Sequence, residues 1–315
     1  MAIVDALASV LPVLLLVGLG ALLARRGFLR PGTVEDMRWL VLYVTLPSSL
    51  FLTFLRVSIE PRHLLVVVPV FAACVAVLVL GPLIGRVIRI RSALLPFLLT
   101  GFEAGMIGYA IYGSVYGVDQ LYRFAIVDIG QVTFVFFVLV TALGRLAPEM
   151  RQSPGRTALG FVRTPVIIAI AAGIAAGALG LASALDATAP GGAALTTLRF
   201  LSAMTTPLIT LVIGATTRIS AGALGLPLRT VVARMAIWVG LAVAFAAFAV
   251  NVLRLDPLFA AAIFTMSVLP APFVIPLYMP DGSAAEDHDY VTSVLSVGTV
   301  ATLIAFPFVV LAFPA

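Results

Sequence analysis

Long apolar stretches without a charged residue constrain this chain more than any other feature. Several such runs are 17 to 26 residues long, and a helix of about 20 residues crosses a bilayer. Hydrophobic residues make up 62% of the 315 residues and charged residues 10%, whereas a soluble domain has about 25% charged residues. So few charged side chains cannot cover a water-facing surface of this size. We therefore predict an all-α polytopic membrane protein whose helices cross the lipid bilayer.

The apolar stretches predict ten transmembrane helices joined by short connections. Their ranges are 6–24, 36–55, 63–85, 92–117, 120–143, 163–183, 199–217, 230–253, 257–279 and 289–313. The longest polar stretch, 144–161, predicts a cytoplasmic linker between residues 1–143 and residues 162–315. Each half then has five spans. Because that number is odd, the second half is expected to be inverted relative to the first, as in many secondary transporters.

The arginines predict the orientation of the chain, since all 19 basic residues are arginines. Fourteen follow spans one, three, five and seven: Arg25, Arg26, Arg30, Arg38, Arg86, Arg89, Arg91, Arg145, Arg151, Arg156, Arg163, Arg218, Arg229 and Arg234. The opposite side has five: Arg56, Arg62, Arg123, Arg199 and Arg254. Basic loops stay in the cytoplasm, so both termini are predicted to lie outside it. Arginines spread along helix ends also argue against a nucleic-acid partner.

Two spans are interrupted at equivalent places in the two halves. Residues 100–117 of span four, TGFEAGMIGYAIYGSVYG, contain five glycines, and residues 267–280 of span nine, SVLPAPFVIPLYMP, contain four prolines. Paired interruptions of this kind point to the transport site of a secondary transporter, although close helix packing is an alternative explanation for each one. The candidate site residues here are Glu103, Gly105, Gly108 and Tyr109 in span four and Pro270, Ala271, Pro272 and Phe273 in span nine.

A break inside a membrane helix exposes backbone groups that need partners. It leaves N–H groups unpaired at the start of one half-helix and carbonyl groups unpaired at the end of the other. Within the membrane these groups have to be paired or face a water-filled cavity. The N–H ends suit an anion and the carbonyl ends suit a cation. We expect Gly105 and Gly108 to let the backbone open and come close at such a site.

Several motifs follow one another in a recognisable order and spacing. Residues 11–51 end in a Leu-Pro-x-x-Leu-Phe step, and residues 101–110 align with an Asn-x-Gly-x-x-Gly-x-Pro pattern. VDIGQ at 127–131 matches an Asp-x-Gly-Asn step, and residues 269–278 and 291–313 supply a ninth and a tenth span. Over nearly the whole chain this order resembles the auxin efflux carrier family of bacteria, its relatives the plant PIN auxin carriers, and the bile-acid symporter-like transporters.

The resemblance implies two inverted five-helix repeats in which helices four and nine cross at their breaks. It also implies a scaffold of helices one, two, six and seven, often dimeric, against which helices three to five and eight to ten slide as an elevator. Pro47 and Ser48 would lie on the scaffold side. Family substrates are organic anions such as auxin, malate and malonate. The implied partners are thus a small organic acid and a second copy of the chain, and the implied location is the bacterial inner membrane.

The chain departs from the family pattern at the central motif. Glu103 stands where the family has Asn, and Ala110 stands where it has Pro. Gln131 replaces the Asn of the fifth-span step, and Tyr109 is bulkier than the usual aliphatic residue. These differences bear on substrate identity and on coupling.

Glu103 and Asp128 are the only acidic residues well inside the predicted spans. A charge at mid-membrane costs about 2.5–3.5 kcal/mol on insertion scales, so such residues usually face a cavity and serve a function. We expect Glu103 to carry a proton, because its protonated form can hydrogen-bond an anionic substrate and its charged form repels one. Direct contact with a cationic or amine substrate is an alternative. A second alternative is that Glu103 is structural and pairs with an N–H group at a helix end or with an arginine.

Asp128 has both structural and functional interpretations. It follows Arg123 by just over one helical turn and shares a helix face with Gln131. A local ion pair with Arg123 or a contact to span four would make it structural. In the functional interpretation, Asp128 and Gln131 both point at the crossing of the interrupted spans.

These observations predict a secondary active transporter of a small organic anion, coupled to protons through Glu103 and without a cofactor or a metal. A sodium-coupled symporter of the same fold and a transporter of a cationic substrate are the alternatives. No G-x-x-x-x-G-K-[ST], H-E-x-x-H or G-x-S-x-G pattern occurs, so we expect neither ATP hydrolysis nor enzymatic catalysis. A membrane sensor is a further alternative, but it would leave the broken helices without a purpose.

Overall fold

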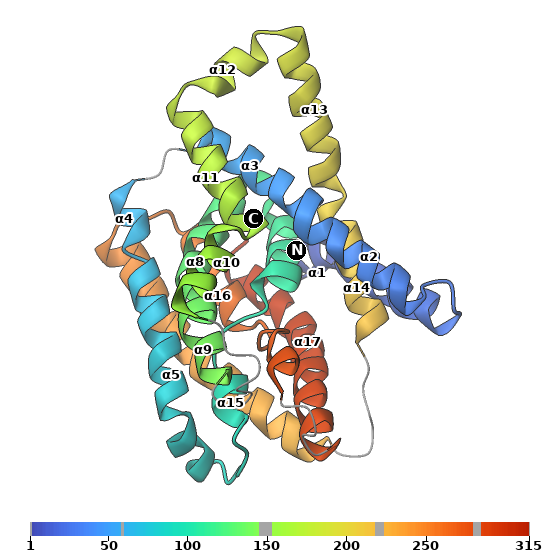
Figure 1. Ribbon diagram of the computed structural model, residues 1–315, viewed down its shortest axis with the longest axis vertical. Helices are drawn as coiled ribbons and strands as arrows, with labels where there is room; N and C mark the ends of the chain where they lie inside the picture. Colours follow the sequence, from blue (N-terminus) through green and yellow to red (C-terminus); the bar gives the residue numbers. More distant parts are fainter. Residues whose placement is uncertain (1, 58–59, 145–152, 218–223, 280–284, 315) are drawn as a thin grey trace.

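A computed structural model describes residues 2–57, 60–144, 153–217, 224–279 and 285–314 (Figure 1). All regular structure within these ranges is helical, and no strand occurs among them. The prediction of an all-α chain is therefore confirmed.

Seven helical segments of the described chain are long and apolar enough to cross a membrane. They are Pro31–Arg56, Pro61–Val87, Leu95–Tyr116, Val118–Leu143, Ala189–Thr216, Gly225–Val252 and Glu286–Ala312. A pair bent by 58°, Gly155–Val162 and Pro165–Ala178, would make an eighth, and Val10–Arg25 and Leu258–Ser267 are shorter apolar helices. The chain thus has the architecture of a multi-pass helical membrane protein, and each of the ten predicted ranges overlaps one of these segments.

The helices of the first half are interrupted by short π-helical turns. In chain order they are α1 (Ala2–Arg25), α2 (Pro31–Leu40), α3 (Leu46–Arg56), α4 (Pro61–Leu64), α5 (Val67–Val87), α6 (Leu95–Leu99), α7 (Tyr109–Tyr116), α8 (Leu121–Phe134) and α9 (Val140–Leu143). The π-helical turns Val41–Thr45, Ala104–Gly108 and Val135–Leu139 join α2 to α3, lead into α7 and join α8 to α9.

The second half contains longer helices. They are α10 (Pro154–Val162), α11 (Pro165–Ala178), α12 (Leu181–Asp186), α13 (Ala189–Ala203), α14 (Thr205–Thr216), α15 (Gly225–Ala247), α16 (Leu258–Ser267) and α17 (Ala285–Ala312). Proline is the first residue of α2, α4, α10 and α11, where its missing N–H costs nothing.

Part of the predicted linker 144–161 is helical. Its last residues form α10, and the Ser153 side chain caps this helix by accepting a hydrogen bond from the backbone N–H of Arg156 at 3.3 Å. The first part of the linker, 145–152, lies outside the described residues.

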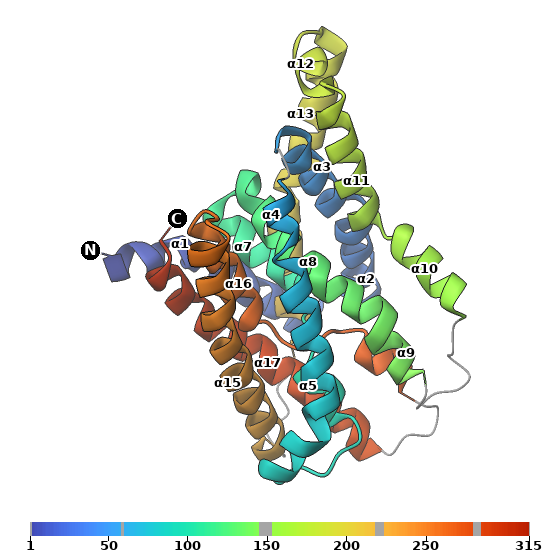
Figure 2. The ribbon, with the colours of Figure 1, turned by 90° about the vertical axis from the view of Figure 1, so that its left-hand side faces the viewer.

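One group of helices is held together by backbone-to-backbone approach at glycines. α1 packs along α14, and α11 packs along α3. A Cβ on Gly214 would collide with the backbone of Val17, and a Cβ on Gly173 would lie 2.9 Å from the Phe51 carbonyl oxygen. Small residues allow such close packing in membranes, where the hydrophobic effect does not drive association. In Figures 1 and 2, α11 and α13, joined by α12, project beyond the rest of the molecule.

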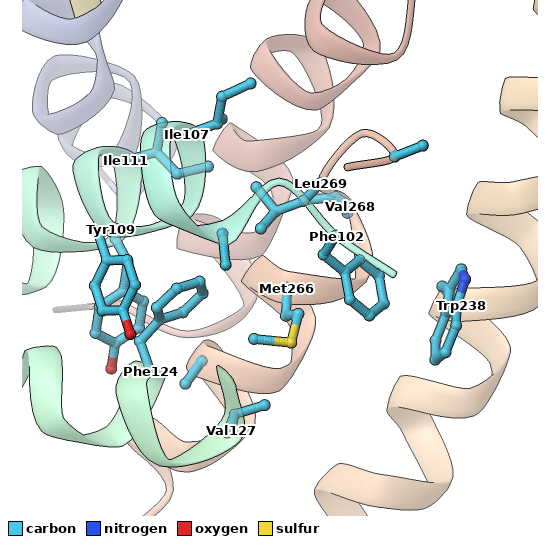
Figure 3. Close-up of a cluster of buried hydrophobic side chains, with 14 of the residues drawn as sticks. Phe102, Ile107, Tyr109, Ile111, Phe124, Val127, Trp238, Met266, Val268 and Leu269 are labelled. Atoms are coloured by element: carbon cyan, nitrogen blue, oxygen red, sulfur yellow. The ribbon is translucent and has the colours of Figure 1, made fainter. Parts of the chain in front are cut away.

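A second group surrounds the interrupted segments. α5 packs on α8, and α15 packs on α16 and α17. Between them lies a buried apolar cluster with side chains from four spans, shown in Figure 3: Phe102, Ile107, Tyr109, Ile111, Phe124, Val127, Trp238, Met266, Val268 and Leu269. This cluster holds the two interrupted helices in place.

Candidate functional site: the crossing of two interrupted helices

The first interruption is an extended stretch between α6 and the π-helical turn. α6 ends at Leu99, residues 100–103 are not helical, and helix resumes at Ala104. Gly101 has a φ of +65°, and a Cβ there would lie 2.8 Å from Cγ of Pro272. Gly101, which the sequence analysis did not single out, is therefore the residue that this break requires.

The two glycines predicted to open the helix behave differently. A Cβ on Gly108 would collide with the ring of Phe124 and lie 2.9 Å from Cδ1 of Leu269, so close approach is found there. A Cβ on Gly105 would have room, with Glu103 Oε1 and Leu42 Cδ2 both 3.9 Å away. Close approach at Gly105 is thus not observed.

The second interruption lies between α16 and a single turn of 3₁₀-helix. α16 ends at Ser267, and the turn Ile275–Tyr278 follows after residues 268–274. Pro270, Ala271 and Pro272 are buried and Phe273 is half-buried. All four belong to the connecting stretch.

The two interruptions meet through Glu103. Its backbone N–H donates to the Pro270 carbonyl at 3.0 Å. Its carboxylate accepts from the N–H of Phe273 at 2.7 Å and from the N–H of Met106 at 3.3 Å. The Glu103 side chain therefore accepts hydrogen bonds from N–H groups of both interrupted segments. These hydrogen bonds join the two breaks, as the sequence led us to expect.

Glu103 is half-buried at the junction between the crossing and helices α2 and α14. Met106 packs with Val34 of α2 and Val212 of α14, and Phe273 borders the same apolar cluster. Arg38 lies on α2, one turn after Val34. The Arg38 guanidinium pairs with Glu35 at 3.2 Å, and its buried Nε has no hydrogen-bond partner among the described residues.

Asp128 and Gln131 form a buried network behind the first interruption. Asp128 is 4% exposed and accepts from the Tyr109 hydroxyl at 2.9 Å and from Nε2 of Gln131 at 2.8 Å. Oε1 of Gln131 accepts from the N–H of Phe102 at 3.1 Å. The network therefore ties α8 to the non-helical stretch of span four.

Of the two structural contacts considered for Asp128, the ion pair with Arg123 does not form. Arg123 instead pairs with Asp256 at 3.3 Å and lies over the Tyr122 ring. The physical reason is that Asp128 is already paired with two neutral donors on the side of α8 that faces α7. The alternative contact to span four is the one observed.

The carbonyl ends of both interrupted helices surround Arg234 of α15. Its guanidinium is 2% exposed and donates to the carbonyls of Leu98 at 3.2 Å, Leu269 at 3.2 Å and Pro270 at 3.3 Å, and also to that of Gly101. The sequence grouped Arg234 with the loop arginines that follow span seven, whereas the structure buries it within α15. Its position within the predicted span 230–253 could have identified it from the sequence, because a charged residue inside a membrane span is a candidate functional residue.

Other side chains satisfy the neighbouring carbonyls. Trp238 Nε1 donates to the Leu99 carbonyl at 2.8 Å, and the Thr302 hydroxyl donates to the Val268 carbonyl. Thr100 donates to the Cys74 carbonyl at 2.8 Å and so fixes the end of α6 against α5. The crossing is therefore closed by hydrogen bonds on its carbonyl side.

Buried hydroxyl groups join α3 to the end of α13 and the start of α14. Ser49 lies 2.8 Å from the Ser202 hydroxyl and 3.1 Å from that of Thr205. The predicted residue Ser48 bonds only to the Val44 carbonyl of its own helix, at 2.7 Å, and Pro47 is half-buried. Ser49, which was not predicted, is the residue that joins α3 to α13 and α14.

No protein-family model matches the chain, and no curated protein matches it significantly. Its function is therefore inferred from the geometry just described. That geometry places a carboxylate on the N–H ends of two broken helices and a guanidinium on their carbonyl ends.

Proposed function

We propose that the chain is a secondary active transporter of a small organic anion, driven by the proton gradient through Glu103. The observation that carries the proposal is the position of the Glu103 carboxylate on the N–H groups of Met106 and Phe273. These N–H groups are the donors that a substrate carboxylate would use at a pair of broken helices. Glu103 therefore acts as a resident anion that a substrate has to replace.

Protonation makes this replacement possible. A carboxylate accepts hydrogen bonds only, whereas a protonated carboxyl has a donor and less acceptor capacity. A proton on Glu103 removes its negative charge and weakens its hold on both N–H groups, which then bind the anionic substrate. The proton and the anion cross together and leave on the other side, where Glu103 again takes the N–H groups. Each cycle carries one proton with each negative charge.

The helix packing supports two inverted repeats of five spans. With ten spans, α1 and α14 are spans one and seven, and α11 and α3 are spans six and two. An inverted repeat makes these two pairs equivalent. Both pairs pack closely. In each pair a glycine lies against the backbone of the partner helix: Gly214 of α14 against α1, and Gly173 of α11 against α3. The scaffold of spans one, two, six and seven and the elevator movement of the remaining spans are parts of the same proposal.

The family, the location and the assembly are proposed on the same basis. The meeting of breaks in spans four and nine supports membership in the auxin efflux carrier family, and a homodimer in the bacterial inner membrane follows from it. With Arg234 removed, thirteen arginines still favour the cytoplasmic side.

Uptake by proteoliposomes tests the function. A panel of small carboxylates and amines is offered to wild type and Glu103→Gln, with and without an inward proton gradient. We expect a carboxylate to accumulate with the gradient in wild type, and Glu103→Gln to exchange it without accumulating it. Glu60→Gln, which changes an exposed carboxylate paired with Arg62, is the matched control. Movement of amines alone would favour the cationic alternative and contradict the proposal.

A further inference from the structure

The carbonyl side of the crossing has the composition of a cation site. Four main-chain oxygens, those of Leu98, Gly101, Leu269 and Pro270, surround one buried space between the two interrupted helices. The carbonyl ends of helices carry partial negative charge. In transporters with broken helices, such ends bind the coupling cation.

A covalently attached cation, the Arg234 guanidinium, fills that space. All three nitrogens of the Arg234 guanidinium donate to these carbonyls, and its carbon lies 5.0 Å from the centre of the Phe102 ring. No carboxylate within the described residues forms a salt bridge with Arg234. A buried charge has to be paired or fully hydrogen-bonded, so the carbonyl dipoles are what stabilise this one.

We propose that these four carbonyls form a monovalent-cation site and that the Arg234 guanidinium is its built-in occupant. Since the site is filled by the protein itself, the wild-type chain needs no sodium. Removal of the guanidinium leaves the four oxygens facing this space without a positive charge, and Na⁺ or Li⁺ enters and draws them in as ligands. The consequence for coupling rests on the proposed transport function, whereas cation binding to the crossing does not.

Thermal unfolding of the purified protein in detergent tests the site independently of transport. Wild type, Arg234→Ala and Arg234→Lys are compared in sodium, lithium and choline chloride at equal ionic strength. We expect Arg234→Ala to unfold at a lower temperature than wild type in choline. Sodium at several times its dissociation constant should raise the Tm of this variant by about 2–4 °C. Wild type and Arg234→Lys, which keep an attached cation, should give the same Tm in all three salts.

Trp238→Phe is the matched control, because it removes the hydrogen bond to the Leu99 carbonyl and leaves Arg234 in place. It should lower Tm without any response to sodium. Arg234→Gln, a neutral variant of similar length, replaces Arg234→Ala if the latter does not fold. A sodium-specific stabilisation of wild type, or a neutral Arg234 variant with the same Tm in sodium and choline, would overturn the inference. Sodium-independent uptake by wild type tests the coupling consequence separately.

Discussion

The Glu103 carboxylate accepts a hydrogen bond of 2.7 Å from the backbone N–H of Phe273, although 170 positions separate the two residues in the chain. This contact joins the interrupted helix of the first half to that of the second. It places an ionisable group on backbone donors that would otherwise be free for a ligand. The proposed coupling of proton and anion movement depends on this contact.

Gly101→Ala should destabilise the protein. The backbone at Gly101 is left-handed, which costs about 1–2 kcal/mol for a residue with a Cβ, and that Cβ would also press on Pro272. Tm in detergent measures the effect. Gly240→Ala is the control, because a Cβ there meets nothing within 4 Å in α15. An unchanged Tm for Gly101→Ala would mean that the break is not built as described.

Tyr109→Phe and Asp128→Asn should show energetic coupling. Tyr109→Phe leaves a buried carboxylate with one donor fewer, at a cost of about 1–3 kcal/mol. In the double variant the loss should be smaller than the sum of the two single losses, by about 0.5 kcal/mol or more. Free energies of unfolding for wild type, the two single variants and the double variant, each measured in a denaturant series, give this double-mutant cycle. Strict additivity would show that the hydroxyl and the carboxylate do not interact.

Gly214→Ala should loosen the packing of α1 on α14. The added Cβ meets the backbone of Val17, and overpacking of this kind costs about 1–3 kcal/mol. Gly18→Ala is the control on α1, since a Cβ there meets nothing within 4 Å. We expect Tm to fall for the first variant and to stay level for the second. Equal Tm values for Gly214→Ala and Gly18→Ala would argue against the close packing of α1 on α14.

Ser49→Ala should cost more stability than Ser48→Ala. Ser49 bonds to Ser202 and Thr205 across two helices, so its loss leaves buried hydroxyls short of a partner and costs about 1 kcal/mol. Ser48 is also buried but bonds only to the Val44 carbonyl one turn back, so its replacement leaves no side-chain partner unpaired and should cost less. Chemical unfolding of both variants in the same detergent decides the matter. The reverse order would contradict the observed hydrogen bonds.

The helices and their interruptions could be predicted from local sequence. Apolar length predicted the spans, because a membrane helix pairs its own backbone. Glycines and prolines predicted breaks in residues 100–117 and 267–280, since these residues weaken or block helix hydrogen bonding. Glu103 could also be identified from local sequence, because it is a lone acidic residue in an apolar segment.

The partners across the crossing could not be predicted from the sequence. Which N–H meets Glu103, and which of Gly101, Gly105 and Gly108 has to be glycine, depends on how two distant segments pack. Arg234 was grouped with the loop arginines because arginines near span ends usually face the cytoplasm. The pairing of Asp128 with Tyr109 rather than Arg123 likewise depends on the direction in which each side chain points from α8.

Proton movement during anion uptake is the sharpest test of proton coupling through Glu103. Proteoliposomes with a trapped pH-sensitive dye receive the transported carboxylate without an imposed gradient, and substrate and proton entry are recorded together. The account predicts that wild type acidifies the interior in step with anion uptake and that Glu103→Gln exchanges the anion without moving protons. Equal proton entry in wild type and Glu103→Gln would contradict it.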